Sequence, residues 1–177
     1  MIFSDEILEK FSGSTPLFPL PDFVLFPFTG YTFRIFEEKY IKMVEDVLKN
    51  EKLICVTQID PKGTSTRSDA PKIYPIGTLA YIFNSKKLDN GEFVIMTFAL
   101  KKAQINETEK THLYRIGALT ILEDNTIINQ EEKQRKKLFR KFSALVDQAT
   151  GELDISVFQN PHLNIEMLVN MICQSLP

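Results

Sequence analysis

The side chains that most often do chemistry in proteins are few and widely separated in this sequence. The two histidines, His112 and His162, are isolated, and the two cysteines, Cys55 and Cys173, form no Cys-x-x-Cys pair. A structural zinc site needs about four such ligands at short spacings, so no metal site is predicted. A Cys–His nucleophile would need a local signature that the sequence does not show. Both cysteines lie in apolar stretches, and we expect two buried free thiols, with a disulfide as an alternative that nothing favours.

Phosphate-binding chemistry is also missing from the sequence. A Walker P-loop wraps its backbone around phosphates and ends in Gly-Lys-Ser or Gly-Lys-Thr. None of the seven glycines is followed by lysine and then serine or threonine, and Gly63 has its lysine, Lys62, on the wrong side. We therefore predict no cofactor and no enzymatic activity. A hydrolase with an unrecognised site is the alternative.

Composition and charge indicate a globular protein without bulk attraction to polyanions. Lysine and arginine number 21 and aspartate and glutamate 23, which gives a net charge of −2. That balance argues against nucleic acid or an anionic membrane as a partner. No apolar run approaches the roughly 20 residues that cross a bilayer, and from residues 1–6 we expect no signal peptide. We expect a cytoplasmic protein with no membrane partner.

The stretch over residues 16–44 must position much of the fold. Its prolines fix φ and remove backbone donors, which argues against a helix or an ordinary central strand. The stretch is too apolar for a solvated loop, so we expect extended chain that buries apolar side chains against a sheet. Gly30 is predicted to form a tight turn before a strand at residues 31–35, and a helix is predicted at about residues 38–49.

These residues closely resemble the N-terminal domain of the Lon protease family. The resemblance rests on LFPLPD at residues 17–22, RIFE at residues 34–37, Tyr40, and Met43 with Val44, in the family's order. It implies an α+β fold, with an open antiparallel β pseudo-barrel of the PUA-like type followed by a C-terminal helical subdomain. It also implies a non-catalytic substrate-recognition module that binds unfolded or tagged polypeptide. Without a P-loop, we expect the chain to stand without the family's ATPase and protease domains.

Four more strands are predicted downstream of the helix. They are expected at residues 53–59, 73–83, 92–100 and 113–122. The first is apolar at both parities, so both of its faces should be covered. Asn90 followed by Gly91 predicts a tight hairpin, because this pair supplies the positive φ angles of such a turn. We expect Gly77 and Gly91 at backbone positions that do not accept a side chain.

The spacing of apolar residues changes from residue 129 onward. Apolar side chains then recur at helical intervals, at Leu138, Phe142, Leu145 and Ala149, before a natural stop at Gly151. A second amphipathic helix is predicted at about residues 164–175. We therefore divide the chain into a β-domain at residues 1–122 and a helical subdomain at residues 123–177.

Candidate binding residues come from the aromatic excess of the opening stretch. An unfolded peptide offers backbone hydrogen-bonding groups and scattered apolar side chains, which suit an open sheet edge or a shallow apolar groove. Phe23, Phe28 and Tyr31 are the candidate peptide-binding residues, because residues 28–31 should form a turn at the barrel rim. The alternative is that all three belong to the core. Arg34 and Glu37 are predicted to pair and tie the strand to the helix, with a charged contact for a client as the alternative.

A basic run near the start of the helical subdomain leaves a second functional alternative open. It comprises Lys133, Arg135, Lys136, Lys137, Arg140 and Lys141. Open barrels of the PUA type include RNA binders, so an RNA-binding PUA-like module is the alternative function. We favour a solvated helix face, because no aromatic stacking residues are interleaved on it. The sequence predicts neither the client nor the oligomeric state.

Overall fold

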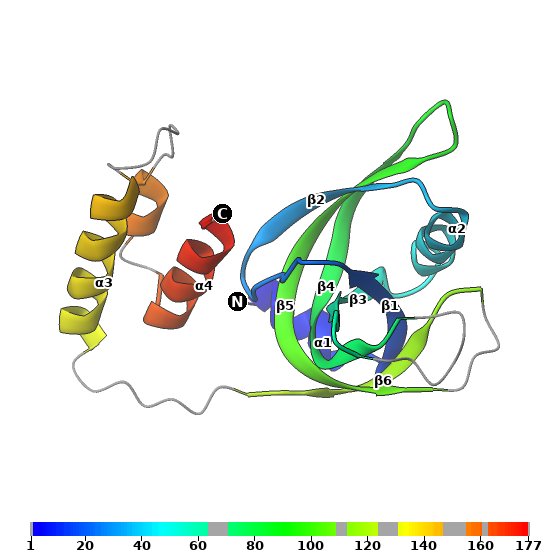
Figure 1. Cartoon of the computed structure of the whole chain (residues 1–177), viewed down its shortest axis with the longest axis horizontal. Helices are drawn as coiled ribbons and strands as arrows, with labels where there is room; N and C mark the ends of the chain where they lie inside the picture. The colour runs from blue at the N-terminus through cyan, green and yellow to red at the C-terminus, as the bar shows by residue number, and fades with distance from the viewer. Residues whose placement is uncertain are drawn as a thin grey trace. The chain divides into compact units, whose positions relative to one another are not determined.

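The computed structural model of the protein describes residues 2–63, 71–108, 113–123, 131–146, 155–160 and 163–176. The chain divides into two compact units, residues 1–123 and residues 124–177 (Figure 1). This division lies one residue from the boundary expected from the sequence.

The first unit is a curled, mostly antiparallel sheet with two helices packed on it. Its elements are α1 (Ile2–Glu9), β1 (Ser14–Leu20), β2 (Gly30–Ile35), α2 (Glu38–Val47), β3 (Leu53–Ile59), β4 (Ile73–Lys87), β5 (Phe93–Glu107) and β6 (Ile116–Ile121). The strand order is β2-β5-β4-β3-β1-β6, and β6 also pairs with β5, so the sheet curls back on itself (Figure 1). β1 and β3 are parallel, and the other pairs are antiparallel. β2 stays outside the curl, which confirms the predicted open pseudo-barrel.

β1 corrects one expectation from the sequence. It lies between β3 and β6, an interior position that its prolines argued against. Residues 14–16 pair with β6 and residues 17–20 pair with β3, so the strand changes partners next to Pro16. Because each ladder is short and involves one side of the strand, the missing proline N–H groups cost few ladder hydrogen bonds.

β3 is buried on both faces, as its apolar residues at both parities predicted. Ile54 and Val56 enter one core cluster, together with the inner face of α2. Leu53 and Cys55 enter a second cluster on the other side of the sheet, against which side chains of α1 pack. The sheet is therefore covered on both sides, which explains the continuous apolar run.

Two glycines occupy positions that exclude a side chain, for different reasons. A Cβ on Gly77 would lie 2.7 Å from the carbonyl oxygen of Val56, so close packing of β4 on β3 requires glycine there. Gly91 has φ +85 in the turn between β4 and β5, where its N–H donates to the Leu88 carbonyl at 2.9 Å. The expected positive φ at Asn90 was wrong, because this longer turn closes with Gly91 alone in the left-handed region.

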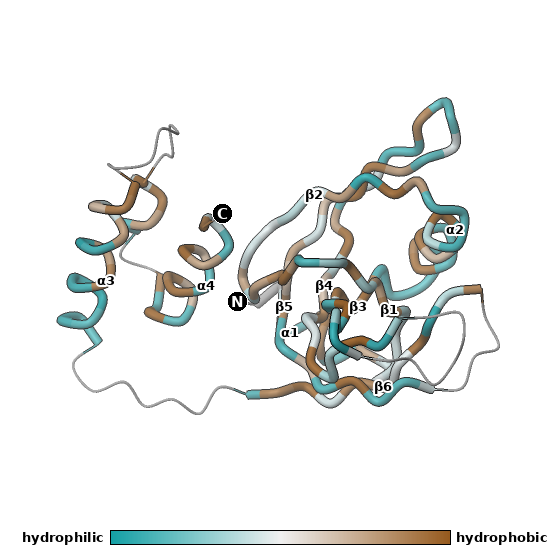
Figure 2. The backbone as a smooth tube through the Cα atoms, viewed as in Figure 1, coloured by the Kyte–Doolittle hydropathy of each residue, from teal (hydrophilic) through white to brown (hydrophobic). Residues whose placement is uncertain are grey.

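The second unit is helical. It contains α3 (Glu131–Val146), a short 3-10 helix η1 (Ser156–Gln159) and α4 (Ile165–Ser175). Hydrophobic and hydrophilic residues alternate around the turns of α3 and α4 (Figure 2), and the apolar side chains form a small core of Phe142, Phe158, Leu168 and Ile172. The side chain of Asn164 caps α4 by accepting from the Met167 N–H at 2.8 Å. Among the residues described, no helix combines the length and the apolar composition needed to cross a bilayer.

Candidate functional site: an aromatic surface beside the edge strand

A chain of aromatic rings runs from the core to the protein surface beside β2. Phe18 contacts Tyr40 of α2 at 4.8 Å between ring centroids and Phe33 of β2 at 5.4 Å. Phe33 in turn contacts Phe23 at 5.6 Å and Tyr31 at 4.7 Å, and these last two rings lie 4.7 Å apart. Edge-to-face and tilted contacts of this kind stabilise aromatic clusters beyond their buried area. We call the outer pair, Phe23 and Tyr31, the aromatic surface.

The alternation of side chains along β2 explains why this row of rings reaches solvent. Tyr31, Phe33 and Ile35 alternate onto one face of the strand, and the last two are buried. Tyr31 lies near the start of the strand, beyond the core, and is 41% exposed. Phe23, in the connection from β1, is half-buried, and its neighbour Val24 is 48% exposed. Strand β2 and the connection before it thus hold two aromatic rings at the surface, in contact with the buried ring of Phe33.

Phe28 occupies a different position from the other two predicted residues. It is half-buried and has φ 65, a left-handed conformation that is uncommon for a bulky residue. Its N–H donates to the Ala99 carbonyl at 2.8 Å, and the Ala99 N–H donates to the Thr29 carbonyl at 2.9 Å. This pattern is a β-bulge whose first residue is Phe28. The tight turn expected at Gly30 was therefore wrong, because the left-handed residue is Phe28 and Gly30 begins the strand.

Two hydrogen bonds hold the connection between β1 and β2, which carries Phe23. Leu25 is fully buried, and its carbonyl accepts a hydrogen bond of 2.6 Å from the Thr78 hydroxyl of β4. The hydroxyl of Thr29 donates to the Phe26 carbonyl, also at 2.6 Å. Because both bonds fix the backbone between β1 and β2, the aromatic surface rests on a rigid support.

Arg34 and Glu37 do not pair with each other, which corrects the prediction made for them. Arg34 donates to Glu92 at 2.6 Å, and Glu37 binds Lys39 at 3.0 Å. The strand is extended at Arg34, so the side chain reaches sideways to the turn before β5 instead of forward to the helix. The hydrogen bond from Arg34 holds the pKa of the Glu92 carboxyl below its usual value. Arg34 is exposed and Glu92 is half-buried, so solvent screens this ion pair and it contributes little to stability.

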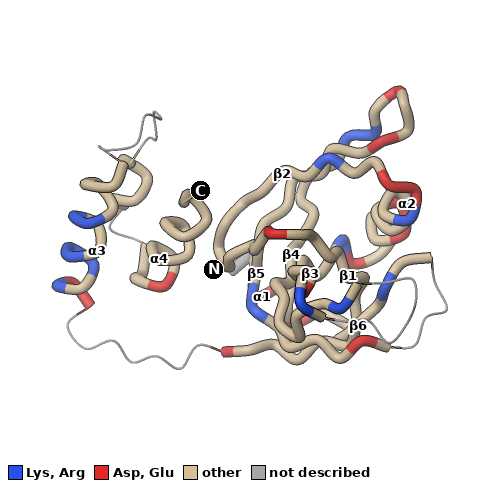
Figure 3. The backbone as a smooth tube through the Cα atoms, viewed as in Figure 1, with Lys and Arg blue, Asp and Glu red and all other residues tan. Residues whose placement is uncertain are grey.

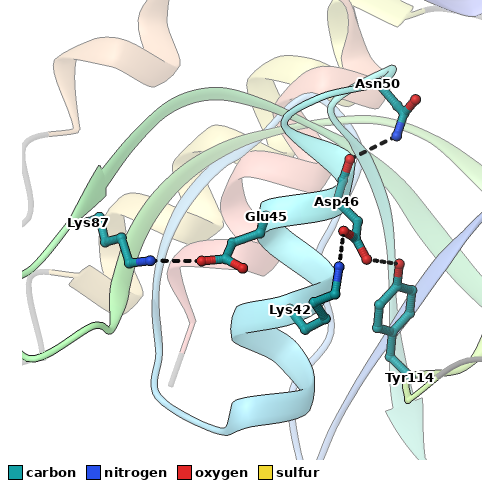
Figure 4. A network of polar contacts seen from close by, with 6 residues as sticks. All are labelled: Lys42, Glu45, Asp46, Asn50, Lys87 and Tyr114. Atoms are coloured by element: carbon teal, nitrogen blue, oxygen red, sulfur yellow. Dashed lines mark hydrogen bonds and ion pairs between the residues drawn. The ribbon is translucent and has the colours of Figure 1, made fainter.

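A hollow of about 380 Å³ lies elsewhere on the first unit, between the start of β1, the end of α2 and the segment before β6. Inside it, the Tyr114 hydroxyl donates to the Asp46 carboxylate at 2.8 Å, and Lys42 binds the other oxygen of that carboxylate (Figure 4). Burial, together with this hydrogen bond, raises the pKa of Tyr114 to about 12. Hydrogen bonds from Lys42 and Tyr114 lower the pKa of Asp46. The network joins α2 to the segment before β6, and sequence reasoning missed it because its members are far apart in the chain.

The two cysteines are free thiols in different surroundings. Cys55 is buried, and burial raises the pKa of its thiol to about 12, so it is protonated at neutral pH. Cys173 is a free, half-buried thiol. His112 and His162 lie outside the described residues. Among the residues that the structure does describe, no three His, Cys, Asp or Glu side chains are grouped to hold a metal ion.

The basic run of α3 is partly engaged within its own unit. Lysines and arginines recur along the helix (Figure 3). The guanidinium of Arg135 donates to the carbonyls of Leu163 and Asn160, next to the start of α4. Lys136 pairs with Glu132 at 3.1 Å one helical turn away. Arg135 thus has a structural role that the charge pattern alone does not reveal.

The comparison with known families agrees with this architecture. The model of the ATP-dependent protease La (LON) substrate-binding domain matches residues 14–177. The chain belongs to this family, which confirms the resemblance inferred from the opening stretch.

The Lon proteases similar to this chain match it over one part of their own length. A Lon protease of Parabacteroides distasonis is 25% identical over 97% of this chain and 21% of that protein. A Lon protease of Trichlorobacter lovleyi is 36% identical over 52% of this chain and 11% of that protein. The Lon N-terminal domain protein from Xanthomonas campestris has a TM-score of 0.56 at 16% identity, over 93% of this chain and 99% of that one. The chain therefore spans about a fifth or less of these two Lon proteases, and the structural neighbour shows the fold.

Proposed function

We propose that this chain is a non-catalytic module that binds unfolded or tagged polypeptide through the aromatic surface of Phe23 and Tyr31. Its family is that of the Lon substrate-binding domain, which supports a role in substrate binding. The polypeptide nature of the ligand, the absence of catalysis by this chain and the location of the site are our proposals. The match to the Lon family covers its substrate-binding domain. Any link of this chain to proteolysis would therefore depend on another domain or protein.

The observation that carries this proposal is the exposure of Tyr31 at the end of a packed aromatic row. An exposed ring normally costs free energy, because apolar surface stays in contact with water. Here the two rings contact each other at 4.7 Å, and both contact Phe33 beneath them, Tyr31 at 4.7 Å and Phe23 at 5.6 Å. A rigid aromatic pair loses little conformational entropy on binding, so it can contribute affinity to many apolar segments.

The test compares two exposed aromatic residues in the same part of the chain. Tyr31→Ser and Phe36→Ser each remove one exposed ring, since Phe36 is 64% exposed just beyond the end of β2. Binding of reduced, carboxymethylated α-lactalbumin, which stays unfolded in solution, is measured by fluorescence anisotropy of the labelled client. We expect Tyr31→Ser to weaken binding by about tenfold, corresponding to about 1.4 kcal/mol, and Phe36→Ser to leave it unchanged.

Melting temperatures separate binding from folding. Tyr31→Ser should lower the melting temperature by only a few degrees, because the ring is far from fully buried. A large fall in stability would mean that Tyr31 is an ordinary core residue, and equal binding by both variants would place the site elsewhere. No binding of the unfolded client by the wild-type protein would refute the proposed function itself.

A further inference from the structure

β2 differs from the other strands in how its sides are paired. Within the described part of the chain, β1, β3, β4 and β6 each pair with two other strands, and β5 pairs with three. β2 pairs with β5 alone, over six consecutive residue pairs without a register shift. It therefore presents one regular, unpaired edge over its whole length.

The register shows which backbone groups face outward at this edge. The Ala99 N–H donates to the Thr29 carbonyl at 2.9 Å, which continues the register of β2 with β5. In an antiparallel ladder, alternate residues direct both N–H and C=O at the same neighbour. Tyr31 and Phe33 thus face β5, whereas Gly30, Thr32 and Arg34 direct their backbone groups away from it. No hydrogen bond that the structure records for described residues engages the outward groups of these three.

A second unpaired edge in the same sheet shows how such edges are usually protected. β4 continues beyond its last pair with β3, and this extension contains a register shift after Ile82 and two lysines, Lys86 and Lys87. Bulges and lysines are the devices by which proteins prevent pairing with another chain. β2 has a regular register, and its one charged side chain, Arg34, is held by Glu92. The edge of β2 is left open to another strand.

The side chains beside this edge define what a further strand would carry. On one face of β2, Tyr31 and Phe23 form the aromatic surface. On the other face, Thr32 lies opposite Met96 of β5, and both are exposed. A strand added next to β2 would turn alternate side chains toward the aromatic surface, because strand side chains alternate between the two faces.

We propose that the edge of β2 binds an extended polypeptide segment by strand addition, and that this segment carries apolar side chains at every second position. The inference rests on the proposed function and specifies how the bound backbone is held. Main-chain hydrogen bonds to Gly30, Thr32 and Arg34 supply affinity that does not depend on sequence. The aromatic surface adds a preference for alternating apolar residues.

The first experiment removes one outward donor. Thr32→Pro deletes the N–H of Thr32, which does not belong to the ladder with β5, and proline is tolerated where the N–H of an edge strand faces solvent. Thr32→Ala is the matched control, because it removes the side chain and keeps the donor. With carboxymethylated α-lactalbumin as the ligand, we expect Thr32→Pro to raise the Kd about tenfold and Thr32→Ala to leave it unchanged. Equal binding by both variants at matched stability would overturn the proposal.

The second experiment uses the unaltered protein, so its outcome does not depend on whether Thr32→Pro folds. Two short synthetic peptides alternate leucine and serine, and one is N-methylated at every leucine and the other at every serine. In a strand, alternate N–H groups face opposite sides, so strand addition predicts that one methylation frame abolishes binding and the other preserves it. Equal affinities in both frames would leave polypeptide binding intact and refute the strand-addition mode.

The protein could also dimerise in a concentration-dependent way that Thr32→Pro abolishes. That result would assign the edge to a second copy of this chain and would also refute the proposal.

Discussion

The hydroxyl of Tyr114 lies 2.8 Å from a carboxylate oxygen of Asp46, and this hydrogen bond joins α2 to the segment before β6. Tyr114 is buried and Asp46 is anchored on its other side by Lys42 (Figure 4). The bond connects residues that are far apart in the chain, so it holds the helix against the curled sheet. The protonation state of the Tyr114 hydroxyl links the stability of the first unit to pH.

The first prediction is a loss of stability at alkaline pH. The pKa of Tyr114 is raised from 10.0 to about 12, so the folded protein keeps this proton over a range in which the unfolded chain loses it. The resulting stabilisation is complete below pH 10 and disappears as pH rises toward about 12. Urea midpoints measured across this range should fall more steeply for the wild-type protein than for Tyr114→Phe. The difference between the two proteins isolates Tyr114 from other groups that titrate there.

At neutral pH, Tyr114→Phe should itself cost about 1 kcal/mol, since Asp46 loses one of its hydrogen-bond donors. Parallel urea midpoints of the two proteins between neutral and strongly alkaline pH would contradict the raised pKa.

The second prediction concerns the left-handed conformation of Phe28. Phe28→Gly and Phe28→Ala lose the same half-buried ring, but only glycine adopts φ 65 without strain. Phe28→Gly should therefore be more stable than Phe28→Ala by about 0.5–1 kcal/mol, the reverse of the usual order. Phe36, at an ordinary negative φ, is the control, and there Ala should be the more stable replacement. Thermal unfolding of the four variants decides the matter, and the usual order at both positions would refute the bulge.

The third prediction separates two reasons for requiring glycine. Gly77→Ala brings a Cβ to 2.7 Å from the Val56 carbonyl oxygen, so it should destabilise the protein by overpacking, by about 1–3 kcal/mol. A Cβ on Gly91 would meet no atom within 4 Å, but Gly91→Val must adopt φ +85, at a cost of about 1–2 kcal/mol. Free energies of unfolding from urea titrations provide the measurement. Unchanged stability of Gly91→Val would show that the turn has been misinterpreted.

The strands and helices were predictable because their burial patterns are local. The apolar run of β3 indicated two covered faces, and the changed spacing beyond residue 129 indicated helices. Position within the sheet was less accessible, since the prolines of β1 suggested an edge although the strand only changes partners near Pro16. The ion pair of Arg34 with Glu92 joins residues 58 apart, and no local pattern indicates such a partner.

The candidate site was partly predictable for the same reason. An aromatic excess near the start of β2 is visible in the sequence, and it pointed to both members of the aromatic surface. The separate role of Phe28 was not visible, because its conformation depends on hydrogen bonds to Ala99 of a strand far along the chain. The unpaired edge of β2 also depends on the strand order, which follows from long-range pairing.

The fourth prediction concerns the two thiols. Cys55 is buried with a thiol pKa raised to about 12, so it should not react with a thiol reagent in the folded protein at neutral pH. Cys173 is only half-buried and should react. Ellman's reagent should therefore titrate one thiol in the native wild-type protein and none in native Cys173→Ala. In urea it should titrate both thiols of the wild-type protein. Rapid reaction of native Cys173→Ala would contradict the burial of Cys55 in the core cluster against which α1 packs.

The most direct test of polypeptide binding at the aromatic surface is an NMR titration. Isotope-labelled protein is titrated with unlabelled carboxymethylated α-lactalbumin, and amide shift changes are mapped along the chain. We expect the largest changes at Phe23, at Tyr31 and along Gly30–Ile35, with small changes around Tyr114. Changes centred on the lysines of α3, or no changes at all at saturating client, would contradict the account.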